Sequence, residues 1–191
     1  LVLRGSQIRH GLSLGLLASL LAPGVGWGQI VVDTTHPTQT TVAATNGVVE
    51  VRGGIASGNN LFHRLSSFDT SPPELKQVYF VTNANANLQV YNLIVGVTGG
   101  VARISKPLVL SSPANLIFMS PRGIEVSGGA SFGYGAANAP LSGVSLSTAN
   151  ELGFNNGNNN IGVFKVLLSQ NETPDYPYGS PNVWGGLSSV S

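Results

Sequence analysis

The sequence contains no cysteine, which excludes disulfide bonds, thiol chemistry and cysteine-ligated metal centres. Charged residues are also scarce. They make up 9% of the chain, against about 25% in an average globular protein. Apolar residues are not scarce, at 42%, and low charge with ordinary hydrophobicity is not typical of disorder. We therefore expect a folded protein held together by hydrogen bonds and by packing of its core.

The few charges nearly balance. Nine lysines and arginines stand against eight aspartates and glutamates. Without Arg4 and Arg9, which lie close to the start, seven basic residues remain. No basic stripe runs along the sequence, and this argues against nucleic acids and anionic lipids as partners.

Helical periodicity is missing as well. No segment keeps an apolar repeat of 3.6 residues, and only residues 72–75 could begin a single turn of helix. Short runs rich in β-branched residues are separated instead by glycine, proline and asparagine, which predicts an all-β protein. These runs cover residues 30–32, 40–42, 48–51, 61–65, 78–82, 90–97, 101–104, 108–110, 116–119, 124–126, 130–134, 144–146 and 161–168.

Two architectures fit many short strands: a β-sandwich and a β-solenoid. Asn46-Gly47 is a strong hairpin signal, but hairpin signals are scarce after it, and strands meet at short corners such as Gly99-Gly100. Asparagine side chains can also stack between coils. These features favour an irregular solenoid without a strict repeat, and the sandwich stays open. The asparagines concerned are Asn83, Asn85, Asn87, Asn115 and those at 155–160.

The N-terminal stretch has the layout of an export signal. Arg4 and Arg9 precede an uncharged apolar run at 12–21, which is shorter than the roughly 20 residues that span a bilayer. A proline and several small residues follow, and they place a cleavage site between Gly28 and Gln29. This pattern predicts a cleavable signal peptide.

Seven short motifs then follow one another over residues 29–152. They are Q-I-V-V-D-T-T (29–35), G-N-N-L-F-H (58–63) followed by Phe68, N-L-I-V-G-V-T-G-G (92–100), A-N-L-I-F-M (114–119), S-P-R-G-I (120–124), G-G-A-S-F (128–132) and S-T-A-N (147–150). In this order they resemble the N-terminal two-partner-secretion (TPS) domain of filamentous haemagglutinin-like exoproteins, in its cyanobacterial form.

The resemblance implies three parts of the chain. These are a signal peptide (1–28), a secretion domain (29–172) and a Pro/Tyr-rich extended tail (173–191) in which further coils would begin. The implied fold is all-β: a right-handed parallel β-helix, a single-stranded solenoid like that of pectin lyase, with an N-terminal β capping region.

The resemblance also implies a function. The domain would be the secretion signal of a large surface protein or adhesin. An outer-membrane TpsB-type β-barrel transporter with periplasmic POTRA-like modules would recognise it and export it, through the periplasm and outer membrane of a Gram-negative cell, to the surface. Glycans of a host or of neighbouring cells would be partners of a passenger. An alternative is a module that binds glycans or cells directly, and a less favoured one is a carbohydrate-active β-helix enzyme.

Recognition is expected through backbone edges and turn loops around 61–68 and 115–124, by addition of a strand. Ser120 and Arg122 replace the two asparagines of the family's N-P-N-G-I turn, and Val95-Gly96 replaces its Ser-Arg. The candidate recognition residues are Asn60, Leu61, Phe62, His63, Asn115, Ser120, Pro121, Arg122, Gly123 and Ile124.

No catalytic, metal or cofactor site is expected. Ser131 lies in a G-x-S-x-G pattern, but no helical pattern and no histidine follow it. Only His36 and His63 remain beyond the signal peptide, and we expect His63 to be a packed or capping residue. The carboxylates are scattered, without metal or glycosidase spacing. We therefore expect a protein that is not an enzyme.

Overall fold

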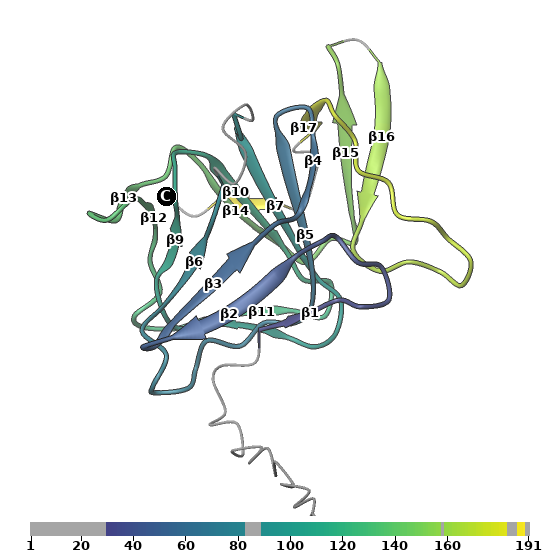
Figure 1. Ribbon diagram of the computed structural model, residues 1–191. Helices are drawn as coiled ribbons and strands as arrows, with labels where there is room; N and C mark the ends of the chain where they lie inside the picture. The colour runs from purple at the N-terminus through teal and green to yellow at the C-terminus, as the bar shows by residue number, and fades with distance from the viewer. Residues whose placement is uncertain (1–29, 83–88, 158, 183–186, 190–191) are drawn as a thin grey trace, which may run out of the picture.

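The structure, a computed structural model, describes residues 30–82, 89–157, 159–182 and 187–189 (Figure 1). The predicted signal peptide and the cleavage site at Gly28 and Gln29 lie outside the described residues, as do Asn83, Asn85 and Asn87. The described part is built of strands, without a helix. The segment 72–75 forms a turn in which Leu75 N–H donates to the Pro72 carbonyl at 3.1 Å.

The chain winds through about three turns of a β-solenoid. Strands of successive turns pair in parallel to form three sheets, which we call A, B and C. The parallel pairs of sheet A are β5 (Asn60–Ser67), β7 (Asn92–Val97), β10 (Asn115–Met119) and β14 (Val144–Ser147). Those of sheet B are β3 (Val48–Arg52), β6 (Gln77–Phe80), β9 (Leu108–Leu110) and β12 (Phe132–Tyr134). Sheet C pairs β8 (Ala102–Ile104) with β11 (Ile124–Val126).

The parallel pairing decides between the two architectures. Strands that pair directly in a sandwich are mostly antiparallel and joined by hairpins. Here each sheet grows by one parallel strand per turn while the chain passes through the other sheets in between. The prediction of a parallel β-helix is therefore confirmed.

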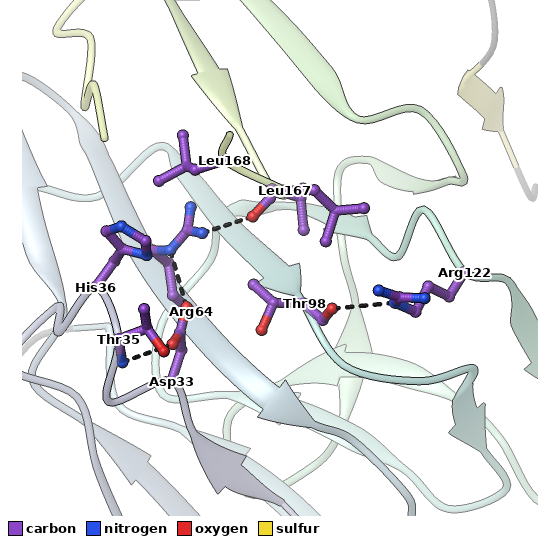
Figure 2. Close-up of a pocket in the computed structure, with 9 residues that line it drawn as sticks. Asp33, Thr35, His36, Arg64, Thr98, Arg122, Leu167 and Leu168 are labelled. Carbon is purple, nitrogen blue, oxygen red and sulfur yellow. Dashed lines mark hydrogen bonds and ion pairs between the residues drawn. The ribbon is translucent and has the colours of Figure 1, made fainter. Parts of the chain in front are cut away.

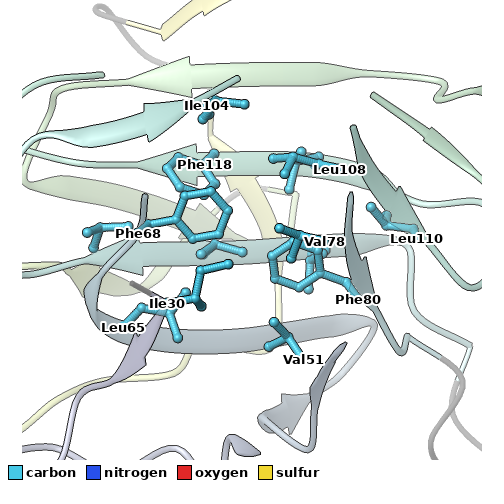
Figure 3. Packing of buried hydrophobic residues seen from close by; sticks show 14 of the residues in the cluster. Ile30, Val51, Leu65, Phe68, Val78, Phe80, Ile104, Leu108, Leu110 and Phe118 are labelled. Atoms are coloured by element: carbon cyan, nitrogen blue, oxygen red, sulfur yellow. The ribbon is translucent and has the colours of Figure 1, made fainter. Parts of the chain in front are cut away.

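The interior of the solenoid is filled by stacked apolar side chains from all three sheets (Figure 3). In-register pairing places like residues above one another, as in Leu61, Leu93 and Leu116 of sheet A. Phe68 and Phe118 meet edge to face, with 4.9 Å between ring centroids. This stacking explains why the sequence needs no strict repeat, since each interior position of a turn requires only an apolar residue of suitable size.

A second core lies on the outer face of sheet A. A hairpin of β15 (Glu151–Asn155) and β16 (Asn160–Lys165) covers this face, and β17 (Ser180–Asn182) pairs with β15. Phe62 is at the centre, with its ring centroid 5.2 Å from that of Phe164 and 5.7 Å from that of Phe154. The core comprises Phe62, Ile94, Ile117, Met119, Leu152, Phe154, Phe164 and Val166.

Antiparallel strands cover both ends of the solenoid. At the first turn they are β1 (Val31–Val32), β2 (Thr41–Thr45) and β4 (Ile55–Ser57). At the last turn they are β13 (Ala139–Pro140) and β18 (Leu187–Ser189). Asn46 (φ 53°) and Gly47 (φ 84°) form the predicted hairpin turn between β2 and β3, with the two positive φ values of a type I′ turn. The predicted N-terminal capping region is confirmed.

Two regions differ from the sequence-based expectation. The described asparagines at 155, 156, 159 and 160 belong to the β15–β16 hairpin and its turn rather than to successive coils, and Asn158 lies outside the described residues. The extended segment from Thr173 does not leave the body of the protein. Pro177 is buried, and the ring of Tyr176 lies 5.5 Å from that of Phe62.

Candidate functional site

Three asparagines stack at the start of sheet A. Asn92 Nδ2 donates to Asn60 Oδ1 at 2.9 Å, and Asn115 Nδ2 donates to Asn92 Oδ1 at 3.0 Å. Asn60 Nδ2 donates to the carbonyl oxygens of Pro177 (3.0 Å) and Gly179 (2.7 Å). This ladder joins three turns and fastens the tail to the first of them. The predicted asparagine ladder is thus confirmed at Asn115, and the amides of Asn60 and Asn115 bond within the protein.

The neighbouring candidates on β5 point alternately to the two cores. Leu61 and His63 face the solenoid interior, and Phe62 faces the hairpin. Their exposed fractions are 4%, 0% and 0%. No partner could reach these three side chains in the folded protein, so their contribution here is to packing.

His63 is a fully buried titratable ring that faces the solenoid interior. Its Nδ1 lies 2.9 Å from Thr40 Oγ1, which is 2.6 Å from Thr38 Oγ1, while its Nε2 has no partner among the described residues. Burial disfavours the charged imidazolium and lowers the pKa of His63 to about 4. The expectation of a packed residue is confirmed, and the ring is neutral at neutral pH.

The turn at residues 120–124 follows β10 directly. Gly123 N–H donates to the Ser120 carbonyl at 3.0 Å, and Gly123 adopts a φ of 121°, which favours glycine. Ser120 is buried, and its hydroxyl donates to the Gly100 carbonyl at 3.3 Å. Pro121 and Ile124 are half-buried, and Arg122 is exposed. Of the ten candidates, Arg122 is therefore the side chain best placed to meet another molecule.

The strand that follows this turn has an unpaired edge. β11 pairs with β8 on one side and with no described strand on the other. The edges expected around 61–68 and 115–119 are occupied, because β5 pairs with β1, β4 and β7, and β10 pairs with β7 and β14. The expectation of a free edge is thus wrong for those two stretches.

A surface pocket of about 260 Å³ lies beside Arg122 (Figure 2). Arg122 Nε donates to the Thr98 carbonyl at 3.3 Å, which holds the guanidinium against the rim. Segments far apart in the sequence meet here: the stretch after β1, the turns after β7 and β10, and the stretch after β16. The lining residues are Asp33, Thr35, His36, Arg64, Thr98, Arg122, Val166, Leu167 and Leu168.

Arg64 joins these segments and was not among the predicted residues. It is 1% exposed, and its Nε lies 3.3 Å from Asp33 Oδ2. Its two terminal nitrogens donate to the carbonyls of Lys165 and Val166, at 2.6 and 2.5 Å. An arginine flanked by Leu61, Phe62 and Leu65 was the available signal, because a charge buried among such residues must find partners.

Gly96 leaves little room for a side chain beside the second core. It pairs in register with Arg64, and a Cβ atom built on it would lie 3.0 Å from Cζ of Phe164. A larger residue would require the ring of Phe164 to give way, so the second core favours glycine at this position.

The remaining sequence motifs gather no reactive groups. Ser131 precedes the strand β12 rather than a helix, and its hydroxyl accepts a hydrogen bond from Asn138 Nδ2 at 3.2 Å. Within the described residues, no three histidine or acidic side chains lie together in a way that could hold a metal ion. Arg103 and Glu125 pair at 2.9 Å on the exposed face of sheet C.

Comparison with known proteins leaves the family unassigned. No protein-family model, no curated protein and no solved structure matches the chain. In the described part of the chain, no helix is long and apolar enough to cross a membrane.

Proposed function

We propose that this chain is the secretion-signal domain of an exported surface protein, recognised by an outer-membrane TpsB-type β-barrel transporter. The observation that carries the proposal is the arrangement of the Arg122 turn and β11. The turn motif that the resemblance singles out leads directly into the strand with the unpaired edge. An edge strand next to an exposed cation is suited to recognition by strand addition, which POTRA-like modules would supply.

The hydrogen bonds between β8 and the stretch around β11 indicate which backbone groups are free for this purpose. Ala102 N–H donates to the Gly123 carbonyl, and Ser127 N–H donates to the Ile104 carbonyl. Alternate residues of a strand direct their backbone groups to opposite sides. Ile124 and Val126 therefore direct their N–H and carbonyl groups away from β8. Val126 is also 50% exposed, so an incoming strand would meet little obstruction.

The stacking of the motifs also supports the proposal. The segments G-N-N-L-F-H, N-L-I-V-G-V and A-N-L-I-F-M occupy equivalent positions on β5, β7 and β10. They are thus layers of one solenoid. A solenoid whose turns stack one after another is suited to export through a β-barrel, because each turn that folds outside the cell prevents the chain from sliding back. Without cysteine, no disulfide bond can form before export and block the passage of the chain. On this proposal the protein passes through the periplasm to the cell surface.

The test is export with the transporter encoded beside this gene. Co-expression should place the protein outside the cell, and omission of the transporter should leave it in the periplasm. Val126→Pro removes one of the two outward N–H groups of β11 and should reduce export strongly, because proline blocks strand addition. Val126→Thr keeps the N–H and is the matched control. Circular dichroism of both purified variants verifies the fold.

Periplasmic retention of the unaltered protein, with a transporter that exports its own substrate, would contradict the proposal. Equal export of the proline and threonine variants would place recognition elsewhere than at β11.

A glycan-binding module is the second candidate, favoured by two exposed tyrosines. Tyr91 and Tyr178 are 51% and 60% exposed. Asn59 and Asn60 position them: Tyr91 N–H donates to the Asn59 carbonyl at 2.8 Å, while Asn60 holds the carbonyls on both sides of Tyr178. Exposed rings fixed in this way can serve as anchors for a ligand.

A glycan array with the chain 29–191 tests this candidate. Binding that is lost in Tyr91→Ala and Tyr178→Ala, but kept in Val126→Ala, would favour a glycan-binding module. An array without signal from a protein with a β-type circular dichroism spectrum would exclude glycan binding for the glycans displayed.

A further inference from the structure

We propose that the pocket beside Arg122 binds a carboxylate that carries an apolar body. The ligand would be a peptide chain end, an acidic side chain next to an apolar residue, or a small branched organic acid. This inference is independent of the proposed function, because it concerns binding to the isolated chain.

Arg122 supplies the donors. Its Nε is engaged with the Thr98 carbonyl, and its two terminal nitrogens have no acceptor among the described residues. A guanidinium held at one nitrogen still presents a planar pair of N–H groups, which matches the two oxygens of a carboxylate. The bond to Thr98 also fixes the fork at the rim of the pocket (Figure 2).

The other charges of the pocket neutralise each other. Arg64 Nε pairs with Asp33, whose second oxygen accepts the Thr35 N–H at 2.9 Å. The terminal nitrogens of Arg64 already serve the carbonyls of Lys165 and Val166. Arg122 is thus the one uncompensated charge, and a single positive charge suits a monoanion better than a dianionic phosphate.

Part of the pocket lining is apolar, although more of it is polar. Leu167 and Leu168 form this apolar part and are half-buried, and Val166, which precedes them in the chain, is fully buried. A ligand that presents only charge would leave the two leucines in water, whereas an aliphatic body next to the carboxylate would cover them. The pocket therefore fits a carboxylate with a branched aliphatic group.

Nuclear magnetic resonance titration of the ¹⁵N-labelled chain 29–191, which contains every described strand, tests the inference. The probe is 3-methylbutanoate, and its neutral amide, acetate and inorganic phosphate are the comparisons. Two further probes separate the sources: acetyl-Gly-Leu with a free chain end, and acetyl-Leu-Glu-amide. Arg122→Gln removes the fork, and Arg103→Gln, at an exposed arginine outside the pocket, is the matched control.

We expect 3-methylbutanoate to shift the backbone signals of Thr35, Thr98 and Leu167 and the Nε–H signal of Arg122 in a saturable manner. Binding should weaken about tenfold or more in Arg122→Gln, because a charge-assisted pair is lost, and should be unchanged in Arg103→Gln. The amide should not bind, and acetate and phosphate should bind more weakly. Tighter binding of acetyl-Gly-Leu would identify a peptide chain end as the ligand, and tighter binding of acetyl-Leu-Glu-amide would identify an acidic side chain.

The inference is overturned if the amide produces the same shifts as the acid, or if Arg122→Gln binds 3-methylbutanoate as well as the unaltered chain does. It is also overturned if phosphate binds more tightly than 3-methylbutanoate, or if 3-methylbutanoate shifts the signals around every exposed arginine to the same extent. This experiment measures ligand binding by the purified chain and does not measure export. The binding proposal can therefore fail while the export proposal holds, and the reverse.

Discussion

At the scale of single residues, Arg64 shows how one buried charge can organise distant segments. It binds Asp33 from the N-terminal stretch and two carbonyls from the end of β16. A buried ion pair need not add stability relative to apolar residues, but removal of one member leaves the other charged and desolvated.

Arg64→Met should therefore destabilise the protein by about 3–5 kcal/mol. Asp33→Asn in the same chain should recover part of this loss, because the unpaired carboxylate is then gone. Chemical unfolding of the two single variants and the double variant measures the coupling. A loss below about 1 kcal/mol for Arg64→Met would show that the pair is effectively exposed to solvent.

His63 predicts how stability depends on pH. Its pKa falls from 6.5 in the unfolded chain to about 4 in the fold. Between these two pH values the unfolded chain therefore binds more protons than the folded protein. The contribution of His63 to the free energy of unfolding is most favourable above pH 6.5 and declines as the pH falls towards 4. The full decline corresponds to about 3 kcal/mol.

Unfolding in urea at steps from pH 7 to pH 5 measures this slope, in a range where carboxylates contribute little. His63→Gln should remove most of the slope, since glutamine does not titrate. His36→Gln, at the other histidine beyond the predicted signal peptide, should retain it. A slope that persists in His63→Gln would mean that another group titrates on unfolding.

At the scale of elements, the hairpin of β15 and β16 depends on sheet A for its packing. The ring of Phe164 contacts Phe62 and covers Gly96. Phe164→Ala should cost about 3–5 kcal/mol, because it opens a cavity in the second core. Val163→Ala, at the exposed neighbour on the same strand, should cost much less. Thermal unfolding compares the two, and equal losses would show that the hairpin does not pack on the solenoid.

The parallel strands could be predicted from the sequence, and so could most of β16 through the run at 161–168, but β15 could not. β7, β10 and β11 carry compact runs of apolar or β-branched residues that end at glycine or proline corners, so their positions followed from local pattern. β15 contains two glycine or asparagine positions among five residues, and the tip of the hairpin is rich in asparagine. Its strand character depends on contacts with Phe62 and Ile117 of sheet A, which lie far away in the sequence.

The same distinction applies to the site. Arg122 could be predicted, because it lies in a proline–glycine turn and replaces an uncharged asparagine of the N-P-N-G-I motif that the turn resembles. The pocket beside it could not, since Asp33, Arg64 and Leu167 meet only through the topology. The sequence could predict that recognition would use an unpaired strand edge. It could not predict which strand has that edge, because strand pairing depends on the topology.

At the scale of the whole molecule, almost every strand edge of the solenoid is covered. Antiparallel strands cap sheets A and B at both ends, and the hairpin shields the outer face of sheet A. Among the described solenoid strands, β11 is the exception. Natural β proteins protect such edges against unwanted pairing, and β11 is therefore the edge at which the proposed transporter would add a strand.

Amide hydrogen exchange at β11, with and without the purified periplasmic modules of the proposed transporter, tests this proposal most directly. The account predicts that the modules slow exchange of the outward N–H groups of Ile124 and Val126 by about tenfold or more, while those of the already paired β7 and β10 change little. Binding of the modules without added protection at Ile124 and Val126, or failure of the modules to bind the folded chain, would contradict it.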